Sequence, residues 1–145
     1  MYESTMPPAG VRTSDALCDW GADCGIGIYD RPLSGADALC VCGGGLEAVA
    51  VDGRRLRTEA DRRCALAHEL GHLRTGALYT EFSSPADVRR AEYRADVWAA
   101  QTLIPRDKLL SVLADGATEL WQIAEHFSVT EKLAAFAMNI YGLAN

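Results

Sequence analysis

The stretch LAHELGHLRTG, Leu66 to Gly76, places two of the chain's three histidines four residues apart. On a helix, residues four apart lie on one face, so His68 and His72 would present their imidazoles side by side and could bind one Zn²⁺. Glu69 lies one residue round the helix from the first imidazole, a position that suits a general base acting on water at the metal. The alternative is a surface helix with two solvated histidines, and the rest of the chain decides between the two.

A catalytic zinc site needs a third protein ligand, and a second helical stretch can supply it. The segment AEYRADVWAAQTLIP, residues 91–105, contains Glu92 and Asp96, which are four apart and so share one face. A short loop lets this segment fold back against the first helix. We therefore predict Glu92 as the third ligand and Asp96 as the acceptor of a hydrogen bond from a ligand histidine. The alternative is that both carboxylates pair with Arg89 or Arg94 on a solvated face.

Capping residues and apolar spacing predict an α+β fold with a small N-terminal sheet of about three strands, the HExxH helix and several C-terminal helices. Residues 1–12 are predicted to be a flexible lead-in, and residues 13–145 a single domain. The first helix should begin at Thr13 or Ser14 and end at Gly25. The predicted strands lie in 26–30, 38–44 and 46–53. The later helices are predicted at about 58–74, 84–104, 105–114, 118–126 and 130–141.

Composition and charge limit the classes of protein that the chain can represent. The net charge of −6 argues against broad, phosphate-driven binding of nucleic acid. The first residues lack the basic and apolar pattern of a signal peptide, and no apolar run approaches the roughly 20 residues of a membrane-spanning helix. We therefore expect a cytoplasmic protein. Its five cysteines are expected to be reduced and to act as small core residues.

The chain resembles the ImmA/IrrE-like metallopeptidases of bacteria and their mobile elements. The matching stretches are RCALAHELGH, AEYRADVWAAQTLIP and the tail ELWQIAEHFSVTEKLAAFAM, within residues 47–143. The resemblance implies a zincin-like α+β fold, with His68 and His72 as zinc ligands, Glu69 as base and Glu92 as third ligand. It also implies a protein substrate, since such proteins commonly cleave a helix-turn-helix repressor encoded nearby and so relieve repression.

A DNA-binding regulator is the main competing hypothesis, because residues 119–142 have the outline of a helix-turn-helix. Base edges are read by Arg, Lys, Asn or Gln, and the second helix offers only Lys132 and Asn139 among apolar residues. We therefore interpret it as a packing helix and expect no sequence-specific DNA binding. Trp121, Ile123 and Phe127 are expected to face the core. A third possibility is a metal-containing regulator that binds a repressor without cleaving it.

Several residues near the motif have alternative interpretations. Tyr79, Tyr93 and Arg74 are candidates to stabilise a developing oxyanion, although structural roles are favoured for each. Gly71 within a helix costs about 1 kcal/mol relative to alanine, which a close approach by the sheet or by substrate backbone would explain; the alternative is a tolerated small residue. The segment RRLRTEADRR, residues 54–63, is interpreted as a solvated helix start, with a docking surface for an acidic partner as the alternative. His126 is interpreted as structural.

Overall fold

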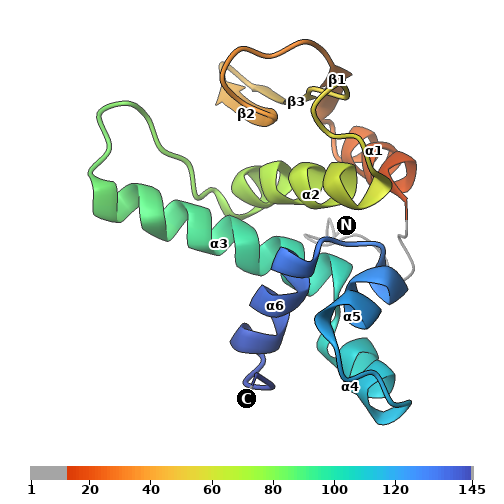
Figure 1. Cartoon of the computed structure of the whole chain (residues 1–145). Helices are drawn as coiled ribbons and strands as arrows, with labels where there is room; N and C mark the ends of the chain where they lie inside the picture. The colour runs from red at the N-terminus through yellow and green to blue at the C-terminus, as the bar shows by residue number, and fades with distance from the viewer. Residues whose placement is uncertain (1–12, 145) are drawn as a thin grey trace.

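A three-stranded sheet lies over two helices, and four more helices extend away from it (Figure 1). The computed structural model describes residues 13–144, so the predicted lead-in at 1–12 lies outside the described residues. The elements, in chain order, are α1 Ser14–Asp23, β1 Gly27–Asp30, β2 Ala38–Gly43, β3 Leu46–Val51, α2 Glu59–Thr75, α3 Pro85–Leu103, α4 Arg106–Ala114, α5 Leu120–Phe127 and α6 Glu131–Ile140. The α+β architecture and the predicted order of elements are confirmed.

The sheet has the order β1-β3-β2 and is mixed. β2 and β3 form an antiparallel hairpin in which Gly43 pairs with Leu46 across a two-residue turn. The turn residues, Gly44 and Gly45, have φ of 59° and 79°, the left-handed region that glycine enters without steric penalty. β1 pairs with β3 in parallel, which leaves β2 at an edge of the sheet.

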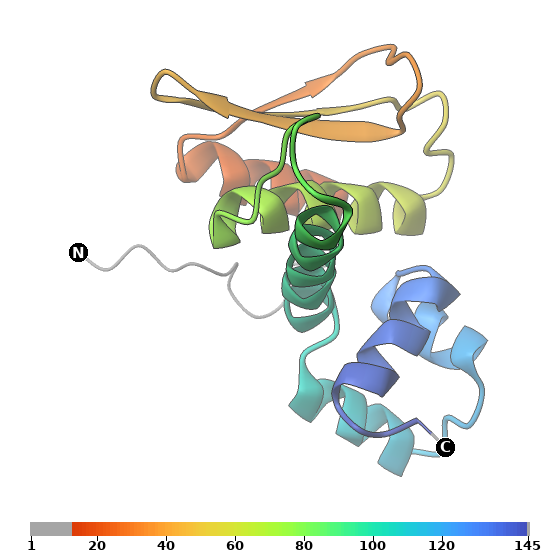
Figure 2. The same ribbon diagram turned by 90° about the vertical axis from the view of Figure 1, so that its left-hand side faces the viewer.

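One face of the sheet packs on α1 and α2, which lie side by side beneath it (Figure 2). Val49 from β3, Leu17 from α1 and Leu66 and Leu70 from α2 are at most 2% exposed and belong to one core. Burying an aliphatic side chain of this size contributes about 1.5–3 kcal/mol. This burial fixes α2 against the sheet. The face of α2 that carries the two histidines therefore lies alongside β2.

Local capping sets the ends of the two long helices. The Thr58 side chain accepts a hydrogen bond from the Asp61 amide at the start of α2, and Gly76 ends the helix in the left-handed conformation with φ of 68°. Ser84 caps α3, and proline occupies its first position, where no N–H is needed. The sequence predicted both boundaries to within a residue or so.

α2 and α3 cross closely at Gly71. A Cβ atom placed there would lie 2.8 Å from the backbone oxygen of Ala95. A close backbone approach is therefore present at Gly71, but the approaching backbone belongs to α3 and not to the sheet or a substrate, as the sequence had suggested. The glycine lets the two helices approach one another where each carries its candidate metal-binding residues.

The helices α4 to α6 pack beyond α3. The buried side chain of Arg63 in α2 connects α2 to these helices by hydrogen bonds. Arg63 is 1% exposed and donates hydrogen bonds to the carbonyl oxygens of Ser128, at 3.1 Å, and Phe127, at 3.3 Å. These carbonyls belong to the end of α5, where the helix leaves acceptors without intrahelical partners. The interpretation of residues 54–63 as a solvated helix start was therefore wrong for Arg63.

Two further predictions about the core need correction. Trp121 is 55% exposed, whereas Ile123 is buried and Phe127 partly buried against the core. Residues two apart on a helix point about 200° apart, so Trp121 and Ile123 cannot share a face. Cys42 is exposed near the end of β2, while the other four cysteines are partly buried against the core. Within residues 13–144, no helix combines the length and the apolar character needed to cross a bilayer.

Candidate metal centre

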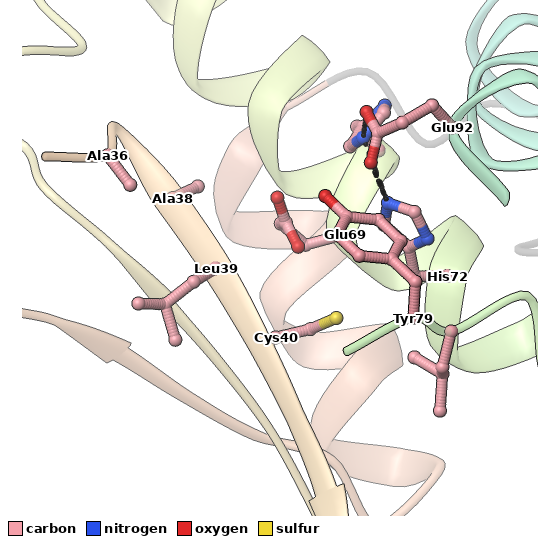
Figure 3. Close-up of a pocket in the computed structure, with 10 residues that line it drawn as sticks. Ala36, Ala38, Leu39, Cys40, Glu69, His72, Tyr79 and Glu92 are labelled. Atoms are coloured by element: carbon pink, nitrogen blue, oxygen red, sulfur yellow. Dashed lines mark hydrogen bonds and ion pairs between the residues drawn. The ribbon is translucent and has the colours of Figure 1, made fainter. Parts of the chain in front are cut away.

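Four of the predicted site residues converge between α2 and α3. The Nε2 atoms of His68 and His72 lie 3.1 Å apart. Glu92 faces both, with Oε2 3.1 Å from Nε2 of His68 and Oε1 3.0 Å from Nε2 of His72. Figure 3 shows the contact between Glu92 and His72. The fourth, Asp96, lies one turn further along α3, behind His68. The close crossing at Gly71 makes this convergence possible, because it brings the two helix faces together.

The other ring nitrogen of each histidine is held by an acceptor. Nδ1 of His72 lies 2.6 Å from the backbone oxygen of Ala77, and Nδ1 of His68 lies 2.7 Å from Oδ1 of Asp96. A carbonyl oxygen and a carboxylate can only accept, so both Nδ1 atoms carry the proton. In the neutral rings each Nε2 atom is then unprotonated and can bind a metal through its lone pair, as metal ligation by histidine requires.

The donor set fits a divalent cation. Two imidazole lone pairs and one carboxylate have ligand atoms within 4.8 Å of one another. With the protons on Nδ1, neither Nε2 atom carries a hydrogen that it could donate to the Glu92 carboxylate. Such a group is electrostatically unfavourable unless a cation lies at its centre. The same field acts on His68: burial opposes its charged form, but the hydrogen bond to Asp96 and the nearby carboxylates outweigh burial and raise the pKa of the ring. Nitrogen and carboxylate ligands of this kind are those that zinc binds in catalytic sites.

The cluster opens into a pocket of about 340 Å³ between α2, β2 and the loop that follows α2. Glu69 lines this pocket beside His68, His72 and Glu92, and its wall toward β2 is apolar. His72 is almost fully buried at the floor, and the side chain of Glu92 is 38% exposed. A ligand entering from solvent would therefore meet the carboxylate of Glu69 and the open side of the His–His–Glu group together.

Tyr79 also lines the pocket, at the loop side (Figure 3). Its ring packs edge-on against His72, with ring centroids 5.8 Å apart. Burial, a hydrogen bond to Glu92 and nearby negative charge raise the pKa of the Tyr79 hydroxyl to about 12, so the group keeps its proton at neutral pH. Of the three tyrosine and arginine candidates, Tyr79 is the one placed at the site. Tyr93 is exposed and packs against the ring of Phe136.

The family model described as the IrrE N-terminal-like domain (Peptidase_M78) matches residues 54–139, more than half of the chain. The chain belongs to this peptidase family. The matched range contains all of the predicted site residues, His68, Glu69, His72, Glu92 and Asp96, and family membership supports a metallopeptidase-type function. A comparison with curated proteins found no match.

Within this IrrE-like domain the structure adds partners that the sequence did not indicate. The backbone oxygen of Ala77 orients His72, a role that any residue type can fill and that leaves no sequence signal. Cys40 lines the pocket from β2, although strand pattern alone indicated a core residue. His126, the third histidine, is exposed on α5 and contacts the ring of Phe127, away from the cluster. Asp96 is placed where a hydrogen-bond partner of a ligand histidine should lie.

Proposed function

We propose that this chain is a zinc-dependent endopeptidase that cleaves a protein partner, with His68, His72 and Glu92 as zinc ligands and Glu69 as general base. The observation that carries the proposal is the convergence of three ligand atoms within 4.8 Å of one another beside a fourth, separate carboxylate in one pocket. A purely structural metal site is closed by four protein ligands, whereas three protein ligands leave a position open for chemistry.

The side chains divide the work of peptide hydrolysis between them. A zinc ion held by this group supplies Lewis acidity, which lowers the pKa of water and polarises a carbonyl. Glu69 accepts the proton of the attacking water and then delivers it to the leaving nitrogen. Asp96 holds the ring of His68 in the tautomer that ligation needs. The protonated hydroxyl of Tyr79 is the candidate donor to the oxyanion that forms on the carbonyl oxygen.

The substrate we propose is a helix-turn-helix repressor encoded beside this chain, cleaved in the cytoplasm to relieve repression of a mobile element or a stress response. Support for this substrate comes from the resemblance to ImmA/IrrE-like proteins. The apolar pocket wall formed by Ala36, Ala38, Leu39 and Leu78 offers no basic side chain to attract a phosphate backbone. A protein substrate is therefore favoured over nucleic acid.

Metal content tests the ligand set. Protein purified without added metal should contain one zinc per chain by elemental analysis. His72→Ala should lose most of it, whereas the matched variant His126→Ala, which removes the exposed histidine of α5, should retain it. Full zinc content in His72→Ala would exclude the assignment.

Cleavage tests the base. Glu69→Gln keeps the shape of the side chain but cannot accept the proton at neutral pH, and the loss of general-base catalysis lowers the rate about 10²–10⁴-fold. The control Glu125→Gln replaces an exposed carboxylate of α5. Each protein is mixed with the neighbouring repressor, and fragments are followed by mass spectrometry. Equal cleavage by wild type and Glu69→Gln would refute the proposed base.

A non-proteolytic regulator predicts a different result. Such a protein would hold zinc and bind the repressor or its operator without producing fragments. A gel-shift experiment at low salt should show no tight, sequence-specific DNA binding by this chain. Nanomolar binding that weakens steeply with salt would favour the regulator instead.

A further inference from the structure

Cys40 faces Glu69 across the pocket. It lies in the middle of β2, an edge strand, where it pairs with Val49 of β3. Its side chain is partly buried and lines the same pocket as Glu69 and His72, and Figure 3 shows it projecting from β2 toward the side of α2 that carries Glu69. The thiol lies close enough to the Glu69 carboxylate for the two side chains to interact.

A glutamate that works as a base has to be held in one orientation. Its side chain has several rotatable bonds, and fixing such a chain costs conformational entropy. Misplacement of a reacting group by about 1 Å can lower a rate 10²-fold. A partner on a regular strand orients a side chain more rigidly than one on a loop. β2 is such a support, since it is paired along its whole length with β3.

We propose that Cys40 is a positioning residue for Glu69: its thiol, fixed on β2, donates a hydrogen bond to the Glu69 carboxylate and holds it toward the His68–His72–Glu92 group. The catalytic consequence of this inference rests on the proposed function. The contact between Cys40 and Glu69 does not depend on that function. An S–H group is a weak donor, so it can orient the carboxylate without the strong charge pairing that an arginine or lysine would impose.

The environment of the thiol agrees with this contact. Burial, the negative charge of Glu69 and the hydrogen bond to Glu69 raise the pKa of the Cys40 thiol to about 12. Cys42 lies two residues further along β2 and is exposed, so the same chain carries an internal comparison.

Thiol alkylation tests the contact without any substrate. The full chain is treated with iodoacetamide, and the modification of Cys40 and Cys42 is followed with time by peptide mass spectrometry. Because the thiolate is the reactive form, removing the charge in Glu69→Gln should speed alkylation of Cys40 by about tenfold and leave Cys42 unchanged. An unchanged rate at Cys40, or an equal acceleration at both cysteines, would overturn the contact.

Cleavage kinetics test the role. Cys40→Ala should lower kcat about tenfold with little change in KM, because Glu69 loses its orientation while the pocket remains. Cys40→Ser retains a donor and should recover most of kcat, and Cys42→Ala should match wild type. Melting temperatures within a few degrees of wild type show that the variants are folded.

The two levels of failure are separate. Full kcat in a folded Cys40→Ala variant would overturn the positioning role even if the alkylation result holds. Absence of cleavage by wild type would instead refute the proposed function. The alkylation rates would then still decide whether Cys40 contacts Glu69.

Discussion

Replacement of Gly71 by alanine should change the stability of the protein in two opposite ways, through a gain in helix propensity and a loss in packing. Alanine in a helix interior is favoured over glycine by about 1 kcal/mol. At Gly71, however, the new Cβ would lie 2.8 Å from the backbone oxygen of Ala95, 3.2 Å from its Cα and 3.3 Å from Cβ of Trp98. Carbon–oxygen contacts settle at about 3.3–3.6 Å, so α3 must move away by roughly 0.5 Å.

Overpacking typically costs about 1–3 kcal/mol, and because backbone cannot yield as a side-chain tip can, we expect the upper part of that range here, about 2–3 kcal/mol. After the gain in propensity, we expect Gly71→Ala to lose about 1–2 kcal/mol of unfolding free energy, which for a chain of this length corresponds to about 3–7 °C in melting temperature. Glu92 lies one turn before Ala95 on α3, so the same displacement spreads the ligand group. Metal sites tolerate shifts of about 0.2 Å, so zinc affinity should also fall.

Gly21 in α1 provides the matched control. A Cβ there would lie 2.7 Å from Cδ1 of Ile28, nominally as close, but that atom is the end of a flexible side chain. Gly21→Ala should therefore change the unfolding free energy by less than about 1 kcal/mol and leave zinc affinity unaltered. Thermal unfolding by circular dichroism and competition with a zinc chelator measure both quantities. A Gly71→Ala variant as stable as wild type, or less affected than Gly21→Ala, would refute the reasoning.

Three further predictions concern polar contacts. Asp96→Asn should weaken zinc binding about 10–100-fold in a chelator competition, because the hydrogen bond that orients His68 loses its charged acceptor; an unaltered affinity would contradict this role. Arg63→Met should lower the free energy of urea unfolding by about 2–4 kcal/mol, since two carbonyl oxygens at the end of α5 lose a buried, charged donor. A loss below about 1 kcal/mol would argue that water replaces it. Hydrogen bonds from Arg54 and from backbone amides hold the pKa of the Asp52 carboxyl well below its usual range. The ionised carboxyl therefore stabilises the folded protein at pH values above the pKa that Asp52 has in the unfolded chain. This stabilisation is lost as the pH falls through the pKa that Asp52 has in the folded protein. Urea unfolding between about pH 5 and pH 2 should therefore weaken more in wild type than in Asp52→Asn, and parallel pH dependence would exclude this linkage.

Local sequence determined the helices and the candidate ligands of this protein. Caps such as Thr58 and Ser84 act within one turn, so helix boundaries could be predicted without any tertiary information. The spacing of His68 and His72 places both rings on one face of any helix, whatever the rest of the fold. The pairing of that face with Glu92 could be proposed because a short loop leaves few ways for α3 to return.

Only the tertiary structure decided which groups meet across elements. The burial of Arg63, the approach of Ala95 to Gly71 and the contact of Cys40 with Glu69 each join positions far apart in sequence. A charged side chain such as Arg63, a glycine in a helix such as Gly71 and a strand cysteine such as Cys40 each occur in several environments. The sequence alone therefore did not indicate the contacts that these residues make. Periodicity determines which residues share a face of one element. The free energy of packing that face against another element depends on the whole fold, and it alone decides what the face contacts.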